Sequence, residues 1–557
     1  MYKVQGGDGV RGDAGRLLTN DRVPTTVRIT AIIGAVRVAV RRVRDLVPDA
    51  AFSIAVMAVF LVIGAVTAWR HEMWRDEIQA WLLARDSTGP IDLFRHLKYE
   101  GHPGLWHLGL MPLTRLTWNP TIMQAFHLLI AAAAVYVFCA KSPFTRLQKV
   151  LFAFGYFTLY EYSILCRNYG VGMLLLCLFA VAYRERAERP LRPAIALALL
   201  AHTSVHALIV TIALLGALFL DHLLNSLTDT DTAPLRRARV WVSLLVVVAG
   251  IGTSAWQLNP PADTGFAEGW KTAYVRGEAE NATKLVTHAY LPVPESKRAF
   301  WGSHRLGRND WFAGEFYNRH RFGVAVGLVA LFAMTLLTRP AAFAAFGVAT
   351  VGLLTFFYVK YFGSMRHHGF LYLTLIAALW VGRSAWTSSR AYWPFADRWL
   401  WRVGSIALTG ILAVQAWGGV TAVRMEREYV FSHARNLADY IRENGFADHV
   451  IIGQYDPAAS AVLGYLRKDR FYYTNGARFD SFIVWDQARK AVASDDQVVA
   501  AARELADDTL VIRNVVWPEE SRTRHGVEEL TRFTGATVNT EDFFLYRIRS
   551  EEAASGP

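Results

Sequence analysis

Two short groups of charged residues follow the first long apolar run of the chain. The first is Arg75-Asp76-Glu77, and the second is Glu100-Gly101-His102-Pro103, just after Lys98. Neighbouring carboxylates at a membrane edge are costly to desolvate, so a chain that keeps them there is expected to use them. A carboxylate beside apolar surface can have its pKa raised and act as a general base. This chemistry suits an enzyme that acts on a lipid-borne substrate, although Asp76 and Glu77 could simply solvate the first turns of a surface helix.

The composition places the chain among membrane proteins. Of its 557 residues, 53% are hydrophobic and only 19% are charged, whereas soluble domains carry about 25% charged residues. The net charge of +12 comes mostly from arginines in short segments that flank apolar runs. This is the pattern of cytoplasmic loops and argues against a nucleic-acid-binding face. Three cysteines, Cys139, Cys166 and Cys177, lie inside apolar segments and are expected to be packing residues.

The apolar runs predict a polytopic α-helical membrane protein with about eleven spans. Residues 1–50 are polar and rich in arginine, and the run Ala51–Trp69 is long enough to span and has no cleavage site after it. We therefore expect a cytoplasmic basic N-terminal segment and a retained first span. The runs lie near 52–69, 119–140, 150–165, 169–183, 194–203, 205–220, 240–257, 322–338, 340–357, 368–382 and 403–420. Several are shorter than the roughly 20 residues that a straight span needs.

The basic connectors predict the orientation of these spans. Segments 141–149, 184–192, 236–239 and 383–402 are rich in Lys and Arg and are expected to face the cytoplasm of an inner (plasma) membrane. The opposite side then receives the loop at 70–104, the polar breaks at Arg167 and His202, the loop at 258–321, the Arg366 connector and the C-terminus. Segment 105–117 is expected to be an amphipathic helix in the outer leaflet, because a crossing there would invert every later loop.

The pattern changes at about residue 424, so we expect a transmembrane catalytic domain over 51–423 and a small extracytoplasmic α/β domain over 424–557. Short buried strands are predicted at 449–453, 482–485, 509–512 and 542–548, and a helix is predicted at 497–505.

On this topology the polar residues of the membrane region gather on the non-cytoplasmic side. They include acids that can supply a base and cations that can stabilise a phosphate with developing negative charge. Any one of them could equally be a snorkelling cation or a satisfied core histidine. The gathered residues are Asp76, Glu77, Lys98, Glu100, His102, Glu161, Arg167, Tyr169, His202, His206, Arg366, His367 and His368.

In the order of its motifs the chain resembles the GT-C superfamily of integral-membrane glycosyltransferases. The resembling branch holds the protein O-mannosyltransferases and the lipid A aminoarabinose transferases, and the likeness covers about 50–420. The motifs are Arg75-Asp76-Glu77, Gly101-His102-Pro103-Gly104, Cys166-Arg167-Asn168-Tyr169-Gly170 and Met365-Arg366-His367-His368-Gly369. Gly104 stands where the family often has a second proline.

The resemblance implies transfer of a sugar from a polyprenyl-phosphate donor to a glycan, lipid or protein acceptor of the cell envelope. It implies that Asp76 is the general base and that Glu77 positions the acceptor or shares the proton. Lys98, His102, Arg167 and Arg366 would hold the donor phosphate, and the remaining candidate substrate-binding residues are Arg75, Glu100, Tyr169, His202 and His367.

A divalent metal at Asp76 and Glu77 is possible but not favoured, because neighbouring Arg and His already supply positive charge. We therefore expect no cofactor. Two other functions stay open: another lipid-linked transferase or ligase, with a histidine-centred site, or a transporter of lipid-linked sugars, with polar residues near the middle of the membrane. Two motifs carry no functional weight: Asp229-Thr230-Asp231, in an expected cytoplasmic loop, and the sequon Asn281-Ala282-Thr283.

Overall fold

The structure of the protein is a computed structural model that describes residues 48–226, 234–265, 269–271, 273–308, 314–384, 394–490 and 492–550. The chain divides after Phe52 into two units, Met1–Phe52 and Ser53–Pro557. Helix α2 begins in the first unit, and every later element belongs to the second. Most of the expected N-terminal segment and the motif at 229–231 lie outside the described residues.

Seven helices in the described ranges are long and apolar enough to cross a membrane. They coincide with seven of the predicted spans, and only part of the most apolar stretch of each is buried inside the protein. They are α2 (Asp49–Arg70), α6 (Thr121–Lys141), α10 (Val205–Ser226), α11 (Pro234–Leu258), α13 (Gly314–Leu336), α14 (Pro340–Val359) and α16 (Pro394–Glu428).

The predicted number of about eleven spans is not confirmed, because four of the apolar runs form other elements. The run at 150–165 is broken into α7 (Arg146–Ala153) and a π-helical turn η2 (Tyr156–Glu161). Helices α8 (Tyr169–Ala182) and α9 (Leu191–Ala201) have 14 and 11 residues, fewer than a straight span needs. Helix α15 (Met365–Ser384) is long, but nearly all of it is buried between α8, α12 and α14.

Shorter helices connect these long ones. They are α3 (Arg75–Asp86), α4 (Pro90–His96), η1 (Leu97–Tyr99), α5 (Leu105–Leu116), η3 (Tyr183–Glu185), α12 (Arg276–Tyr290) and η4 (Arg305–Gly307). Helix α5 occupies the segment in which a helix is expected, and its Trp106 and Leu110 are buried. Burial of this face explains why the segment folds as a helix although Pro112 lies inside it.

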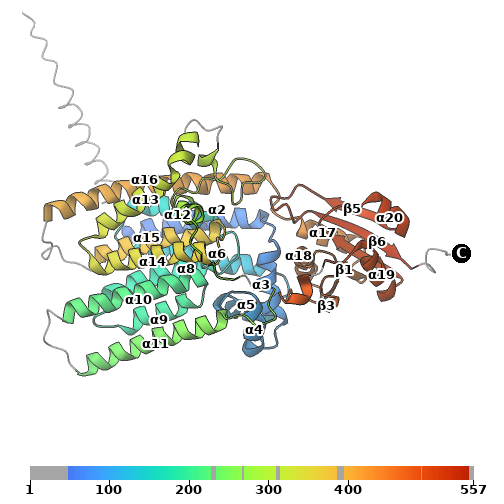
Figure 1. Cartoon of the computed structure of the whole chain (residues 1–557), viewed down its shortest axis with the longest axis horizontal. Helices are drawn as coiled ribbons and strands as arrows, with labels where there is room; N and C mark the ends of the chain where they lie inside the picture. The colour runs from blue at the N-terminus through green and yellow to red at the C-terminus, as the bar shows by residue number, and fades with distance from the viewer. Residues whose placement is uncertain are drawn as a thin grey trace, which may run out of the picture. The chain divides into compact units, whose positions relative to one another are not determined.

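The C-terminal part is a small mixed sheet with four helices, drawn in orange and red in Figure 1. The strand order is β3-β2-β1-β4-β6-β5, in which β1 pairs in parallel with β2 and β4 and the other pairs are antiparallel. The strands are β1 (Val450–Gly453), β2 (Phe471–Tyr473), β3 (Arg478–Asp480), β4 (Asp508–Arg513), β5 (Glu528–Phe533) and β6 (Phe543–Arg549). The helices are α17 (Ala434–Glu443), α18 (Asp456–Leu466), α19 (Asp495–Leu505) and α20 (Glu519–His525), and η6 (Gln487–Lys490) is a single 3₁₀ turn.

The strands predicted at 449–453, 509–512 and 542–548 and the helix predicted at 497–505 are confirmed as β1, β4, β6 and α19. The strand predicted at 482–485 is wrong. Ile483 forms both of its backbone hydrogen bonds with the side chain of Gln79, at 2.7 and 3.0 Å. The apolar run therefore packs against another part of the chain instead of joining the sheet.

The sheet buries both faces, and one of these faces supports the helix that carries Asp76. Val511 and Tyr546 face α19. Leu510 and Leu545 face α17 and α18 and belong to the same apolar core as Ile78 and Trp81 of α3. Helix α18 packs directly on α3, so the C-terminal sheet domain and the start of α3 form one packed structure.

Candidate active site

The centre of the site is the carboxylate of Asp76, on the first turn of α3. It lies 3.1 Å from the guanidinium of Arg366, 3.6 Å from that of Arg167 and 3.8 Å from that of Arg75. Arg167 also donates to the main-chain oxygen of Asp76 at 2.5 Å. Arg167 stands in the turn before α8 and Arg366 in the first turn of α15. The structure therefore brings together three of the four motif segments that the sequence singled out.

These cations determine the protonation state of Asp76. Burial alone would raise the pKa of its carboxyl, but the charges of Arg167, Arg366 and Arg75 outweigh burial and lower the pKa below its ordinary value. The expectation of a raised pKa is therefore wrong for Asp76. Its carboxylate is ionised at neutral pH and is held by positive charge.

The fourth motif segment lies beside the cluster. His102 accepts a bond of 3.4 Å from Arg167 on Nε2 and lies 2.7 Å from the Glu100 main-chain oxygen through Nδ1. Burial and the charge of Arg167 lower the pKa of His102 to about 4, so this side chain is neutral at pH 7 and not a phosphate-binding cation. Burial raises the pKa of Glu100 to about 7, although Gln79 donates to it at 2.7 Å.

Arg366 is enclosed by aromatic rings and keeps a free donor. Its guanidinium carbon lies 5.6 Å from the ring centroids of both Trp74 and Trp301. Among the described residues, the buried Nε of Arg366 and the hydroxyl of Tyr169 have no hydrogen-bonding partner. Tyr169 is close enough to act on Arg366 electrostatically. Two unpaired polar groups beside a cation indicate a place where a ligand oxygen can bind.

Glu77 does not face this cluster. Its side chain is fully buried, and its oxygens accept from the backbone of Trp74 and Cys166 at 3.2 and 2.5 Å and contact His71 at 2.9 Å. Both carboxylate oxygens are therefore already used inside the protein.

Three other predicted site residues contact different partners. Lys98 donates to the main-chain oxygen of Trp256 at 2.7 Å and lies over its ring. His202 contacts the Thr253 hydroxyl at 3.0 Å. His367 accepts from the Ser364 amide at 2.8 Å, and its ring lies 5.6 Å from that of Tyr169. Of these three, His367 alone contacts a residue beside Arg366, namely Tyr169.

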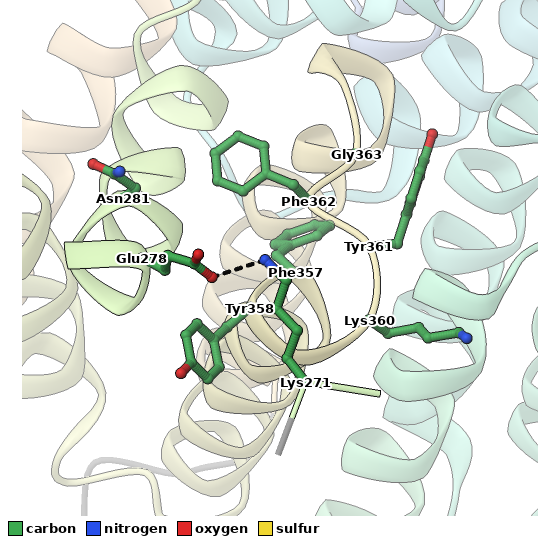
Figure 2. A pocket seen from close by; sticks show the side chains of 9 residues that line it. All are labelled: Lys271, Glu278, Asn281, Phe357, Tyr358, Lys360, Tyr361, Phe362 and Gly363. Carbon is green, nitrogen blue, oxygen red and sulfur yellow. Dashed lines mark hydrogen bonds and ion pairs between the residues drawn. The ribbon is translucent and has the colours of Figure 1, made fainter. Parts of the chain in front are cut away.

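A cavity of about 470 Å³ lies at the end of α14, and Figure 2 shows the side chains that line it. Its walls are the rings of Phe357, Tyr358, Tyr361 and Phe362, together with Asn281, Lys360, Gly363 and the Lys271–Glu278 ion pair of 2.8 Å. The ring of Tyr361 lies 5.3 Å from that of His367, and His367 adjoins Arg366. The cavity therefore approaches the Asp76 cluster through Tyr361.

The C-terminal sheet domain supplies site residues that sequence reasoning missed. Arg75 donates to the Thr540 hydroxyl at 2.8 Å and to the Tyr455 hydroxyl at 3.3 Å, and its main-chain N–H donates to Glu541 at 3.3 Å. Tyr455 has φ 65°, a conformation that is rare outside glycine and concentrates at functional sites. Only this positive φ marks Tyr455, and no sequence pattern reveals it.

Comparison with solved structures identifies the fold. No family model matches the chain, and no curated protein matches its sequence. A crystal structure of ArnT from Cupriavidus metallidurans in the apo state aligns with a TM-score of 0.50 at 12% identity, covering 90% of this chain and 98% of ArnT. A crystal structure of the same ArnT bound to undecaprenyl phosphate gives a TM-score of 0.44 at 12% identity, covering 90% and 99%. ArnT is a lipid A aminoarabinose transferase, so the resemblance expected from the motif order is confirmed at the level of the fold, and the chain shares the ArnT fold over most of its length.

Proposed function

We propose that the protein is a membrane glycosyltransferase that moves a sugar from a polyprenyl-phosphate donor to a hydroxyl group of a cell-envelope acceptor on the non-cytoplasmic side. The observation that carries this proposal is the ionised Asp76 carboxylate between the guanidinium groups of Arg167 and Arg366, 3.6 and 3.1 Å away. One anion that can accept a proton and two cations that can hold a phosphate are what such a transfer needs. The shared fold with ArnT supports the proposal.

The reaction proposed is a single displacement. Asp76 accepts the proton of the acceptor hydroxyl while the oxygen of that hydroxyl attacks the anomeric carbon of the sugar. The bond from that carbon to the phosphate oxygen breaks, and polyprenyl phosphate leaves with the bonding electrons. Arg366 and Arg167 then hold the new negative charge, and the free Nε of Arg366 and hydroxyl of Tyr169 are donors for its oxygens.

The cations also link donor binding to base strength. Without a donor, Arg167 and Arg366 stabilise the ionised form of Asp76 and so weaken it as a base. A bound phosphate shares these guanidinium groups, and its own negative charge disfavours a second anion nearby. Asp76 therefore becomes a stronger base only when the donor is bound, so it does not take up a proton before a sugar is available for transfer.

The aromatic cavity gives the lipid part of the donor a place beside its phosphate. Its walls are mostly apolar, and its Lys271–Glu278 pair is already neutralised, so the cavity suits the first prenyl units better than a charged group. Glu100 and neutral His102 would line the acceptor side and orient Arg167. Lys98 and His202 would support the surrounding loops.

The proposal is tested by transfer with purified protein. Wild type, Asp76→Asn and the control Asp86→Asn are reconstituted in nanodiscs with a panel of polyprenyl-phosphate hexoses and pentoses and a cell-envelope extract. Asp86 is on the same helix and pairs with Arg85 at 2.7 Å, so its variant controls for loss of charge on α3. We expect release of polyprenyl phosphate by wild type and the control, measured by mass spectrometry. Asp76→Asn should be slower by about 10²–10⁴-fold, and near wild-type turnover of this variant contradicts the assignment.

A further inference from the structure

A buried network of hydrogen-bonded ionisable groups, His71, Glu77 and Glu426, begins at the residue after Asp76. His71 contacts Glu77 through Nε2 at 2.9 Å and Glu426 through Nδ1 at 2.8 Å. The side chains of His71 and Glu77 are fully buried, and Glu426 is 3% exposed. The hydroxyl of Tyr160 donates to the other oxygen of Glu426 at 2.6 Å. The network thus joins the start of α3, the end of α16 and the π-helical turn η2.

Both ring nitrogens of His71 face carboxylates, so both are donors and the imidazole is cationic. Burial alone would lower the pKa of His71, but Glu77 and Glu426 outweigh it and raise the pKa to about 10. The imidazolium therefore persists at neutral pH and holds the two carboxylates in fixed directions. Three buried charged groups are costly unless they are fully hydrogen-bonded, and here they are.

At one end of this network, Glu77 is the sequence neighbour of Asp76 and is hydrogen-bonded to Cys166, the sequence neighbour of Arg167. Glu77 follows Asp76 in sequence, and consecutive helical residues point about 100° apart, so Glu77 faces inward while Asp76 faces the arginines. The other oxygen of Glu77 accepts the amide of Cys166 at 2.5 Å, and Cys166 precedes Arg167. A single carboxylate thus ties the backbone on which Asp76 stands to the backbone on which Arg167 stands.

We propose that His71, Glu77 and Glu426 are positioning residues that fix the Asp76 carboxylate relative to the Arg167 guanidinium. This inference rests on the proposed function and replaces contact with the acceptor as the role of Glu77. Glu77 joins the backbones next to Asp76 and Arg167, His71 fixes the direction of the Glu77 carboxylate, and Glu426 holds His71 against α16. Displacement of a catalytic group by about 1 Å can lower a rate by about 10²-fold. Loss of this network therefore lowers turnover without removing any group that touches substrate.

The test compares His71→Gln and Glu426→Gln with the control Asp397→Asn. Gln at 71 can donate from its amide nitrogen to one carboxylate, but its amide oxygen is an acceptor, so it cannot bridge two carboxylates. Gln at 426 keeps the shape and removes the charge. Asp397 forms a comparable buried ion pair with Arg339 at 3.1 Å. Arg339 lies at the opposite end of α14 from the 360–366 connector, and the 20 residues of that helix span about 30 Å. Thermal stability, kcat and the Kd for a polyprenyl phosphate are measured for each protein.

We expect His71→Gln to lower kcat by about 10–10²-fold and Glu426→Gln to lower it less. The Kd should change by a smaller factor than kcat, because Arg366, the other cation proposed to hold the phosphate, pairs with Asp76 and not with His71, Glu77 or Glu426. Asp397→Asn should lose stability while kcat stays unchanged. If His71 and Glu426 only stabilise the fold, all three variants lose stability alike and keep kcat, which overturns the inference. Active wild type beside an unaffected His71→Gln overturns this inference alone, whereas inactive wild type overturns the proposed function as well.

Discussion

At the scale of single residues, the site depends on competition for two guanidinium groups. Asp76 forms ion pairs with Arg366 and Arg167, and in the proposed reaction the donor phosphate binds to the same two guanidinium groups. The same contacts lower the pKa of Asp76 and bind the donor. Removing one cation therefore has two separable effects, one on binding and one on the pH dependence of the rate.

We predict these two effects for Arg366→Gln. Loss of a charged hydrogen bond costs about 1.5–3 kcal/mol, so affinity for a polyprenyl phosphate should fall by about 10–150-fold. With one cation fewer to oppose burial, the pKa of Asp76 rises, so the carboxylate becomes protonated at higher pH. The acid limb of the kcat/KM profile should then move to higher pH, as measured with saturating acceptor. An acid limb in the same place would show that Asp76 is not the titrating base.

The residue types and their order predicted the central group of the site but not its surroundings. Asp76, Arg167 and Arg366 were recoverable because charged residues in apolar sequence are rare and informative. His71 and Glu426 were not, because they lie 355 positions apart and a lone histidine at the end of an apolar run is usually a satisfied core residue. The adjacent carboxylates of Asp76 and Glu77 could not be told apart from sequence, since their roles depend on which face of α3 is buried.

At the scale of elements, the position of α3 is decided by its contact with α18. Gly464 of α18 packs against Ile78, and a Cβ at Gly464 would collide with the Ile78 side chain. Because α3 begins only three residues before Ile78, any displacement there is transmitted to Asp76. The sheet domain therefore controls the geometry of the site through a helix–helix contact.

We predict that Gly464→Ala lowers turnover by displacing α3. The matched control is Gly347→Ala, in the middle of α14, where an added Cβ meets nothing within 4 Å. Alanine at an open helical position is favourable by about 0.5–1 kcal/mol, so the control should keep its activity and gain stability. Turnover and thermal unfolding of both variants are compared with wild type. Equal activity of Gly464→Ala and Gly347→Ala would contradict a role for the α18–α3 contact.

Long apolar helices and alternating strands were predictable because their periodicity is a local signal. The short elements were not. Strands β2 and β3 have only three residues each and exist because β1 offers β2 an edge. The loop at 482–485 is as apolar as a strand, yet it bonds to Gln79. Burial by distant partners, which sequence periodicity does not encode, decided each of these cases.

At the scale of the whole molecule, three segments that the sequence predicts on one side of the membrane meet around Asp76. Counting spans and placing arginine-rich connectors in the cytoplasm put the Asp76 loop, the Arg167 turn and the Arg366 connector on one side. The structure brings these three together in ion pairs, although they are separated by 91 and 290 positions. Which side of the membrane holds them depends only on the positive-inside pattern.

We predict that this side is non-cytoplasmic, and accessible single cysteines can test it. The structure guides the choice of positions. Thr88, Ser494 and Lys141, the last residue of α6, are exposed. Ser87 and Ser142 are buried and therefore unsuitable. With the native cysteines replaced, cysteines at Thr88 and Ser494 should react with an impermeant thiol reagent in spheroplasts. A cysteine at Lys141 should react only after the membrane is opened. Labelling of Lys141→Cys without Thr88→Cys would place Asp76 in the cytoplasm and contradict transfer on the outer side.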